Sequence, residues 1–270
     1  MLCLTFDNFG CASTLPPCPF PDIIPVSEWD AYNKIGLEIG HPRILQLLEQ
    51  LQIRTTYFAE GYAAVLHPTE LLRWRDAGHE IGMHGWKHED WGALRDEAEE
   101  DQLIGLAVEA MSEVLGERPI GFRPPGLHVN AWTDAVMDKH GLRYICQDPM
   151  GVTDPRLAKL GRRMPEPGTP PILSRHPILR CTMDLIDGHL IDAAHGGFFG
   201  AMDADAAFAH YFSLAESHEE KTPDEPWVFI VHPHISGNRA WFAFERFVRQ
   251  LADRFGRAAF VTCREALQLA

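Results

Sequence analysis

The sequence predicts an α/β fold, a distorted and incomplete (β/α) barrel of about seven β/α units. Strand-like and helix-like stretches alternate along the whole chain, which is typical of parallel strands with helices packed outside them. The series is unbroken and contains no internal repeat, so we expect a single domain over residues 1–270. A doubly wound sheet is the alternative that the same alternation allows.

The predicted strands are short apolar or β-branched runs that end in glycine or polar residues. They cover residues 2–6, 54–61, 79–85, 120–126, 142–148, 226–232 and 258–263. The predicted helices have amphipathic spacing, with proline in a first turn or glycine after a last one. They cover residues 41–53, 68–78, 95–115, 131–141, 203–220, 240–256 and 264–270. The Pro- and Arg-rich residues 149–182 receive no assignment.

A long connection at about residues 11–40 interrupts the alternation. It contains five prolines and mixed polarity, and loops of this length inside compact domains are often functional. We expect this active-site loop to roof a small pocket, with Trp29 among the side chains that contact substrate.

Composition restricts the partners. The net charge is −14, from 24 Lys and Arg against 38 Asp and Glu, whereas nucleic acids and anionic membranes require a basic footprint. No segment approaches the ~18 uninterrupted apolar residues of a membrane span, and the first residues lack a basic segment followed by an apolar one. We therefore expect a cytoplasmic protein that acts on a small molecule and binds neither nucleic acid nor membrane.

Side chains suited to catalysis follow four of the predicted strands. They are Asp7 and Asn8, His84 and His88, Arg123, and His232 and His234. Because the carboxyl ends of parallel strands lie on one face, where active sites form, we expect these groups to converge.

The segment HGWKH, residues 84–88, suggests a metal site. Two histidines four residues apart can present both imidazoles to one divalent ion, on a helical turn or a tight loop. An oxygen of Asn8 can supply a third ligand, although a neutral amide is a poorer ligand than a carboxylate. Asp7 would then be the base beside a water that the metal activates.

Arg123 stands before a rigid pair of prolines that begins at Pro124. Its guanidinium can hold a carboxylate in bidentate geometry, which would keep Asp7 ionised. His232 is a candidate general acid, because an unperturbed imidazole has a pKa of ~6.5. We expect His234 and Pro124 to line the pocket.

Four motifs, TFDNFG, HGWKH, FRPPG and VHPHISG, resemble in this order those of the NodB-type polysaccharide deacetylase superfamily (carbohydrate esterase family 4). The segment HPHISG followed by a helix is more similar to the branch that holds allantoinases, cyclic imidases and peptidoglycan-deacetylase-like proteins. The resemblance runs over nearly the whole chain. It implies a NodB-like incomplete barrel, and the imidase-like branch is compatible with a homo-oligomer.

The resemblance also implies roles for single residues. It matches Asp7 to the catalytic base and His232 to the catalytic acid, and Arg123 to the arginine that orients the base. The implied metal ligands, with zinc as the first choice of ion, are His84, His88 and the residue at position 8.

Two points depart from the pattern of the family. Asn8 stands where the family usually has a metal-binding Asp, so the site can be weaker, can prefer zinc or can hold no metal. The Asp that tunes the catalytic acid is open: Asp148 lies at about the right place, whereas Asp184 or Asp187 could instead line the pocket.

The motifs predict a hydrolase of a non-peptide carbon–nitrogen bond, a metal-dependent deacetylase of a small intracellular N-acyl compound or sugar. The alternative is a ring-opening hydrolase of a cyclic imide or ureide, which could use the same residues without a metal. A non-catalytic binding module and an esterase of O-acetyl groups are further alternatives. The sequence does not identify the substrate.

Overall fold

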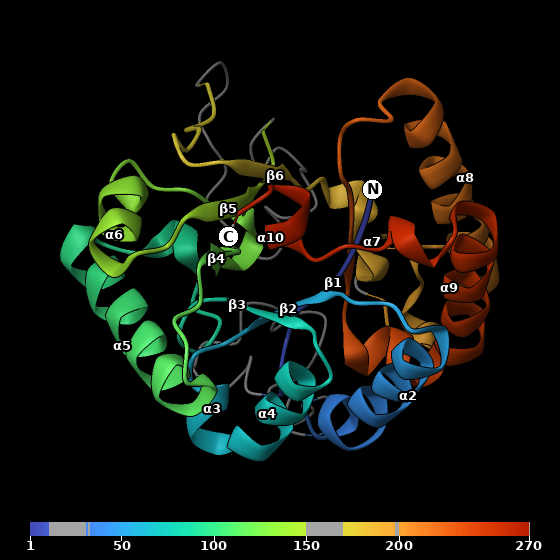
Figure 1. The fold of residues 1–270 in the computed structure, drawn as a ribbon, viewed down its shortest axis with the longest axis horizontal. Helices are drawn as coiled ribbons and strands as arrows, with labels where there is room; N and C mark the ends of the chain where they lie inside the picture. The colour runs from blue at the N-terminus through green and yellow to red at the C-terminus, as the bar shows by residue number, and fades with distance from the viewer. Residues whose placement is uncertain (11–30, 32, 150–169, 198–199, 270) are drawn as a thin grey trace.

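The structure is a computed structural model of the chain, and it describes residues 1–10, 31, 33–149, 170–197 and 200–269. Within this part, parallel strands form one sheet in the order β6-β5-β4-β3-β2-β1-β7. The strands occupy the centre of the molecule and helices surround them (Figure 1). The predicted loop at 11–40 lies largely outside the described residues, and Trp29 lies outside them.

The strands are β1 (Leu2–Phe6), β2 (Thr56–Ala59), β3 (Glu80–Met83), β4 (Gly121–Phe122), β5 (Tyr144–Gln147), β6 (Ile178–Arg180) and β7 (Trp227–Val231). The α-helices are α2 (His41–Leu51), α3 (Ala63–Leu66), α4 (Pro68–Asp76), α5 (Glu97–Leu115), α6 (Thr133–His140), α7 (Asp187–Leu190), α8 (Ala204–Lys221), α9 (Trp241–Phe255) and α10 (Cys263–Ala266). Short 3-10 or π turns are η1 (Gly36–Gly40), η2 (Trp91–Ala93), η3 (Pro125–Leu127), η5 (Met183–Leu185), η6 (Ala193–His195), η7 (Ile235–Arg239) and η8 (Arg257–Ala259).

The sheet curls into a nearly closed barrel. The edge strands β6 and β7 contact each other, and a single parallel bridge joins Ile186, just after η5, to Ile230 of β7. The prediction of a distorted, incomplete (β/α) barrel is therefore confirmed, and the doubly wound alternative is wrong because its two edge strands would lie far apart.

Two predicted segments differ from the structure. Residues 258–263 do not form a strand: after η8, Phe260 makes one parallel bridge to Leu2. The chain then turns into α10, because Thr262 and Glu265 form a capping box that starts the helix. The unassigned residues 149–182 contain β6, whose three residues are too few to show a period in the sequence.

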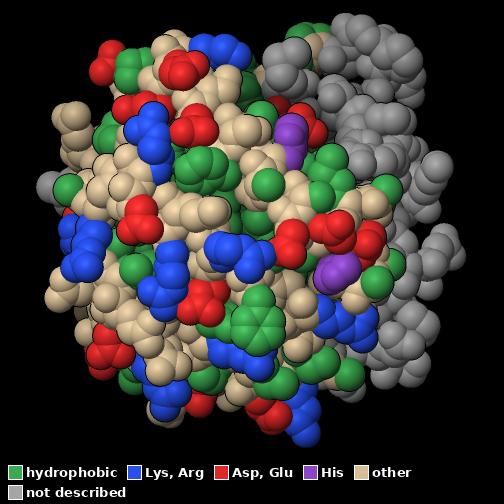
Figure 2. Space-filling view, turned by 90° about the vertical axis from the view of Figure 1, so that its right-hand side faces the viewer, with side chains coloured by type: hydrophobic (Ala, Val, Ile, Leu, Met, Phe, Trp, Pro, Cys, Tyr) green, Lys and Arg blue, Asp and Glu red, His purple; other side chains and the backbone are tan. Residues whose placement is uncertain are grey.

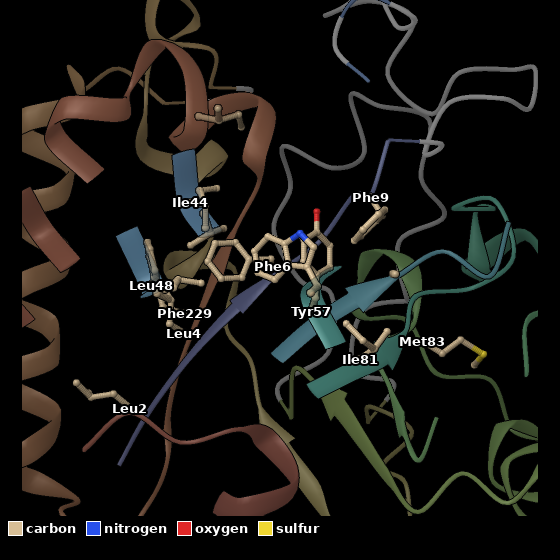
Figure 3. Packing of buried hydrophobic residues seen from close by; sticks show 14 of the residues in the cluster. Leu2, Leu4, Phe6, Phe9, Ile44, Leu48, Tyr57, Ile81, Met83 and Phe229 are labelled. Atoms are coloured by element: carbon tan, nitrogen blue, oxygen red, sulfur yellow. The ribbon is translucent and has the colours of Figure 1, made fainter. Parts of the chain in front are cut away.

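The main core lies between the sheet and the outer helices. Phe6 of β1 and Tyr57 of β2 pack against Trp74 of α4, with ring centroids 5.3 and 4.7 Å apart, respectively. Ile44 and Leu48 of α2 complete this layer (Figure 3). Each of these side chains is almost fully buried, and each such burial contributes about 1.5–3 kcal/mol to folding.

Helix α10 covers the amino ends of the central strands (Figure 1). The backbone N–H of Arg264 donates to Glu80 at the start of β3, at 2.9 Å, and that of Cys263 donates to the hydroxyl of Thr56 at the start of β2, at 2.8 Å. One end of the barrel is thus closed by hydrogen bonds, and the polar residues after the strands gather at the other end.

The face formed by α8 and α9 carries interleaved charges of both signs (Figure 2). Ion pairs join Arg246 to Asp205 and Arg254 to Glu216 across the two helices. On this face, therefore, basic side chains do not form a patch of one sign of the kind that nucleic acid would require. Among the described helices, none is long and apolar enough to cross a bilayer.

We predict that Gly121→Ala destabilises the barrel. A Cβ at position 121 would lie 2.1 Å from the ring and hydroxyl of the buried Tyr144 on the neighbouring strand β5. To remove this clash, the packed strands β4 and β5 must move apart, and that movement costs roughly 1–3 kcal/mol of stability. Urea unfolding should show this loss in the free energy of unfolding.

The matched control is Gly105→Ala on α5. There the nearest atom to the new Cβ is 3.1 Å away, on the ring of His140, and alanine gains about 1 kcal/mol of helix propensity. Equal losses in the two variants would contradict the packing argument.

Candidate active site

The segment after β1 places Asp7 and Asn8 at the open end of the barrel. The N–H of Asp7 donates to the carbonyl of Val231 at 3.0 Å, so Asp7 continues the pairing of β1 with β7. Asn8 has a φ of 64°, in the left-handed region, where Asn is better tolerated than most residues. Both residues are buried, and the amide Oδ1 of Asn8 has no hydrogen-bond partner among the described residues.

Arg123 follows β4 and is fully buried. Its Nη1 donates to Oδ1 of Asp7 at 2.6 Å, its Nη2 donates to the hydroxyl of Thr5 at 2.8 Å, and its guanidinium lies over the ring of Phe58. Burial by itself lowers the pKa of Arg123, but the carboxylate of Asp7 raises it, so the guanidinium stays charged.

The expected bidentate contact between Arg123 and Asp7 is wrong. Thr5 occupies the second nitrogen of the guanidinium, so the arginine reaches only one carboxylate oxygen. The other oxygen, Oδ2 of Asp7, faces Nε2 of His84 at 3.8 Å. The single contact therefore leaves one carboxylate oxygen directed into the site.

His84 follows β3, and the backbone of Arg123 orients its ring. Its Nδ1 lies 2.7 Å from the carbonyl oxygen of Arg123, and this contact requires a proton on Nδ1. Burial lowers the pKa of His84, with the charge of Asp7 as an opposing effect. A neutral ring with its proton on Nδ1 has a lone pair on Nε2, on the side that faces Asp7.

A tight loop brings His88 next to His84. The carboxylate of Glu89 accepts hydrogen bonds from the N–H groups of Trp86, at 3.1 Å, and Lys87, at 2.9 Å, and so folds the loop. His88 itself has a φ of 63°. The two imidazole rings meet edge to face with centroids 4.9 Å apart, so the structure brings the predicted histidine pair together.

His232 follows β7 and is paired with Asp187, the first residue of α7. The carboxylate of Asp187 lies 2.7 Å from Nδ1 of His232 and accepts from its backbone N–H at 2.8 Å. The hydroxyl of Ser236 donates to the same carboxylate at 2.6 Å. Burial lowers the pKa of His232, but the charge and hydrogen bond of Asp187 outweigh it, so that the pKa lies above the usual value.

The charges of Asp7 and Arg123 also act on the pKa of His232, and the charge of His232 acts on that of His84. The predicted groups after β1, β3, β4 and β7 therefore share one site. The sequence left the carboxylate that tunes the acid open, with Asp148 at about the right place. In the structure Asp187 contacts His232, because α7 carries its first residue against the end of β7.

The remaining predicted residues that the structure describes differ in burial and position. Asp148 is buried directly after β5, and Pro124 is buried directly after Arg123. His234 is buried with its ring centroid 5.6 Å from that of His232, and its pKa is lowered to about 3, by burial first and by His232 second. Asp184 is exposed and lines a different cavity, near the start of β7.

Close backbone contact fixes the segment after β7. A Cβ on Gly40, at the end of η1, would lie 2.3 Å from the carbonyl oxygen of Pro233, and one on Gly237 would lie 2.4 Å from Cα of Gly40. Only glycine allows the two backbones to approach in this way. The glycine in HPHISG therefore holds the loop of His232 against the start of α2.

The donors present are of a type that a divalent metal accepts. Nε2 of His84 has its lone pair and His88 lies beside it. The buried Oδ1 of Asn8 has no hydrogen-bond partner in the part of the chain that the structure describes. Zinc binds nitrogen and oxygen donors of this kind. Within the described ranges, however, no three His, Cys, Asp or Glu side chains form a group that could hold a metal ion, so a metal here would depend on the amide of Asn8.

Sequence reasoning missed two residues that contact the Asp7–Asn8 segment. Glu60, at the end of β2, accepts from the N–H of Phe9 at 2.8 Å, and Tyr57 donates to the carbonyl of Asn8 at 3.1 Å. A glutamate in the otherwise apolar run TYFAEG was the available signal, because a charge directly after a buried strand needs a partner.

Comparison with known families identifies a match over part of the chain. Residues 30–145 match the family model described as polysaccharide deacetylase. The matched stretch includes His84, His88 and Arg123. The resemblance to the NodB-type polysaccharide deacetylase superfamily is therefore confirmed.

Two curated relatives cover part of the chain. The peptidoglycan deacetylase of Helicobacter pylori is 33% identical over 107 residues, which are 40% of this chain and 36% of that protein. Chitin deacetylase 1 of Saccharomyces cerevisiae is 32% identical over 107 residues, 40% of this chain and 35% of that protein. The chain thus spans about a third of the length of these relatives.

Solved structures match over nearly the whole chain. Puue allantoinase superposes with a TM-score of 0.73 at 20% identity, covering 99% of this chain and 88% of that one. A family 4 carbohydrate esterase from Streptomyces lividans gives a TM-score of 0.55 at 18% identity, covering 94% and 88%. At these identities the likeness establishes the fold, a NodB-like (β/α) barrel.

We predict that Asp187→Asn lowers the pKa of His232. Without the carboxylate, the effect of burial acts against the charged ring with much less opposition. An NMR pH titration of the histidine rings should show the pKa of His232 fall from above its usual ~6.5 to below it.

Asp184→Asn is the control, because this exposed residue lies three positions earlier and lines a different cavity, near the start of β7. It should leave the titration unchanged. An unchanged titration in Asp187→Asn as well would show that the pair does not set the charge of His232.

Proposed function

We propose that the protein is a hydrolase of a non-peptide carbon–nitrogen bond that removes an acyl group, most simply acetyl, from a small N-acyl compound or sugar. The observation that carries the proposal is the buried ion pair of Asp7 and Arg123, next to a second pair of His232 and Asp187. One pair offers a base and the other an acid, which is what amide hydrolysis needs. The two relatives named as deacetylases support the same chemistry.

Asp7 acts as the base. Arg123 holds Oδ1 and thereby fixes the carboxylate, while Oδ2 is directed toward His84 and accepts a proton from the attacking water. Because the arginine is fully buried, its charge is little screened and attracts the carboxylate of Asp7 strongly.

His232 acts as the acid. Asp187 binds Nδ1 and raises the pKa of the ring, which favours the imidazolium form that carries a proton on Nε2. This proton goes to the nitrogen of the breaking bond, since an amine leaves readily only when it is protonated. Protonated His232 is present below its folded-state pKa, so activity should decline as the pH rises through that value.

Asn8, His84 and His88 would hold a divalent metal, zinc in the first place. When bound, such an ion polarises the substrate carbonyl and lowers the pKa of water. The neutral state of His84 suits this role, because an imidazolium cannot be a ligand. A small intracellular substrate and a cytoplasmic location are part of the proposal.

We predict that Asp7→Asn and His84→Ala abolish turnover of small N-acetyl substrates. Loss of a positioned base costs on the order of 10²–10⁴-fold in rate. Asparagine keeps the shape of the side chain but leaves the charge of Arg123 uncompensated, at a cost of about 3–5 kcal/mol. Circular dichroism should show that the variant, although less stable, is still folded. Initial rates with a panel of N-acetyl amines and N-acetyl sugars measure the effect.

The control is Asp205→Asn, the same substitution at an exposed ion pair on α8. It should keep the rate of the unmodified protein. If Asp7→Asn kept that rate too, Asp7 would not be the base.

A second candidate is ring opening of a cyclic imide or ureide without a metal. It is favoured by Asn8, which stands where the resemblance expects a carboxylate, and by the lack of a group of three His, Cys, Asp or Glu ligands in the described part of the chain. The same base and acid would serve this reaction, because the broken bond is again a carbon–nitrogen bond.

We predict that a chelator removes the N-deacetylase activity and that zinc restores it. Asn8→Asp should bind zinc more tightly than the unmodified protein, because a carboxylate replaces a neutral oxygen. Metal analysis, zinc titration calorimetry and rates before and after dialysis check both statements. Full activity on succinimide or hydantoin after chelation, with none on N-acetyl amines, would instead establish the second candidate.

A further inference from the structure

One peptide group in the site is held at both ends. The carbonyl of Asn8 and the N–H of Phe9 belong to the same peptide bond. The hydroxyl of Tyr57 donates to that carbonyl at 3.1 Å, and Oε2 of Glu60 accepts from that N–H at 2.8 Å. The two partners are three positions apart: Tyr57 lies in β2 and Glu60 directly follows it.

The hydroxyl of Tyr57 is itself held. Nε2 of His41, the first residue of α2, lies 2.9 Å from it. Burial, with a smaller effect of the charge of His67, lowers the pKa of His41 to about 3, so the ring is neutral. Since Tyr57 gives its proton to Asn8, the proton of His41 must be on Nε2. The chain of hydrogen bonds thus runs from α2 through β2 to Asn8.

Ring packing leaves the tyrosine little freedom. Its ring lies 5.8 Å from that of Phe6 and 4.7 Å from that of Phe9, so it fills the space between the end of β1 and the residue after Asn8 (Figure 3). Tyr57 and Glu60 are both fully buried.

The position of the Asn8 side chain depends on this peptide. Asn8 adopts a left-handed φ of 64°, which costs roughly 1–2 kcal/mol for an L-residue. Two hydrogen bonds to buried partners, one of them to a carboxylate, outweigh that cost. The result is a buried amide oxygen that faces no partner in the described part of the protein.

We propose that Tyr57 and Glu60 are positioning residues that clamp the Asn8–Phe9 peptide and so hold the Asn8 amide oxygen in the catalytic site, available to a cation or a substrate N–H. The inference rests on the proposed function for its kinetic consequence. The clamp itself does not depend on the proposed function and is tested by a separate measurement.

A purely structural role does not account for Glu60. A buried carboxylate is costly unless it is satisfied, and an apolar residue would fill the space after β2 at lower cost. The carboxylate reaches Phe9 of the segment after β1, 51 positions away in the chain. The contact with the N–H of Phe9 therefore explains why a charged side chain, and not an apolar one, stands at position 60.

The first test is amide exchange, which needs no substrate. Glu60→Ala should speed exchange of the Phe9 N–H by at least about tenfold and shift the side-chain NH2 signals of Asn8 in NMR spectra. Glu60→Gln keeps an acceptor oxygen and should restore most of the protection. Unchanged exchange of Phe9 in Glu60→Ala would overturn the clamp.

The second test is a double-mutant cycle on turnover of an N-acetyl amine. Tyr57→Phe should lower kcat on the order of tenfold with KM little changed, since a displaced group costs rate. In an Asn8→Ala background the same change should add almost nothing. Fully additive effects would overturn the proposal, because Tyr57 would then act independently of Asn8.

Thr56→Val is the matched control on the same strand. It removes two buried hydrogen bonds, to Glu80 and from Cys263, at the closed end of the barrel. It should reduce stability but leave kcat and the exchange of Phe9 unchanged. If Glu60→Ala speeds the exchange of Phe9 but the unmodified protein turns over no N-acyl compound, the clamp is supported and the proposed function is rejected.

Discussion

The buried ion pair of Arg123 and Asp7 is the constraint on which the site depends. A guanidinium with no exposed surface is stable only beside a charge and in contact with acceptors, and removal of one partner leaves an uncompensated charge that costs about 3–5 kcal/mol. The groups around it meet this requirement: a carboxylate and a hydroxyl from the end of β1, and the ring of Phe58 from β2. The carbonyl of the arginine then orients His84. The charge and the carbonyl of Arg123 thus fix the relative positions of β1, β2, β3 and β4 at this end of the barrel.

The surroundings shift the pKa values of two histidines of the site, His84 and His232, in opposite directions. Burial acts on both rings and favours the neutral form. For His84, burial outweighs the raising effects of Asp7 and of the contact with the carbonyl of Arg123, so the pKa is lowered, whereas His232 directly contacts Asp187 and its pKa is raised. The raised pKa suits His232 to donate a proton, and the lowered pKa suits His84 to act as a neutral ligand.

Much of the barrel and most of the candidate site could be predicted from the sequence, because both depend on local patterns. Buried strands show as short apolar runs, and the residues directly after them must meet at one face. The failures concern contacts that no local pattern encodes. Asp187 reaches His232 across 45 positions, and its segment follows a strand of only three residues. No feature of the sequence around Thr5 indicates that its buried hydroxyl accepts a hydrogen bond from Nη2 of Arg123.

Position 8 determines how charge is balanced in the pocket. Without a metal, the site contains two matched pairs, Asp7 with Arg123 and Asp187 with His232 when the latter is protonated. A divalent ion on Asn8, His84 and His88 would add two positive charges to neutral donors in a buried place, and burial of uncompensated charge is costly. A carboxylate at position 8 would reduce the excess positive charge from two to one. Asn8 therefore weakens the hold on a metal relative to a carboxylate and leaves the base and acid pairs unchanged. The same substitution that lowers metal affinity preserves the proton-transfer groups, which is the property that a metal-free hydrolase would need.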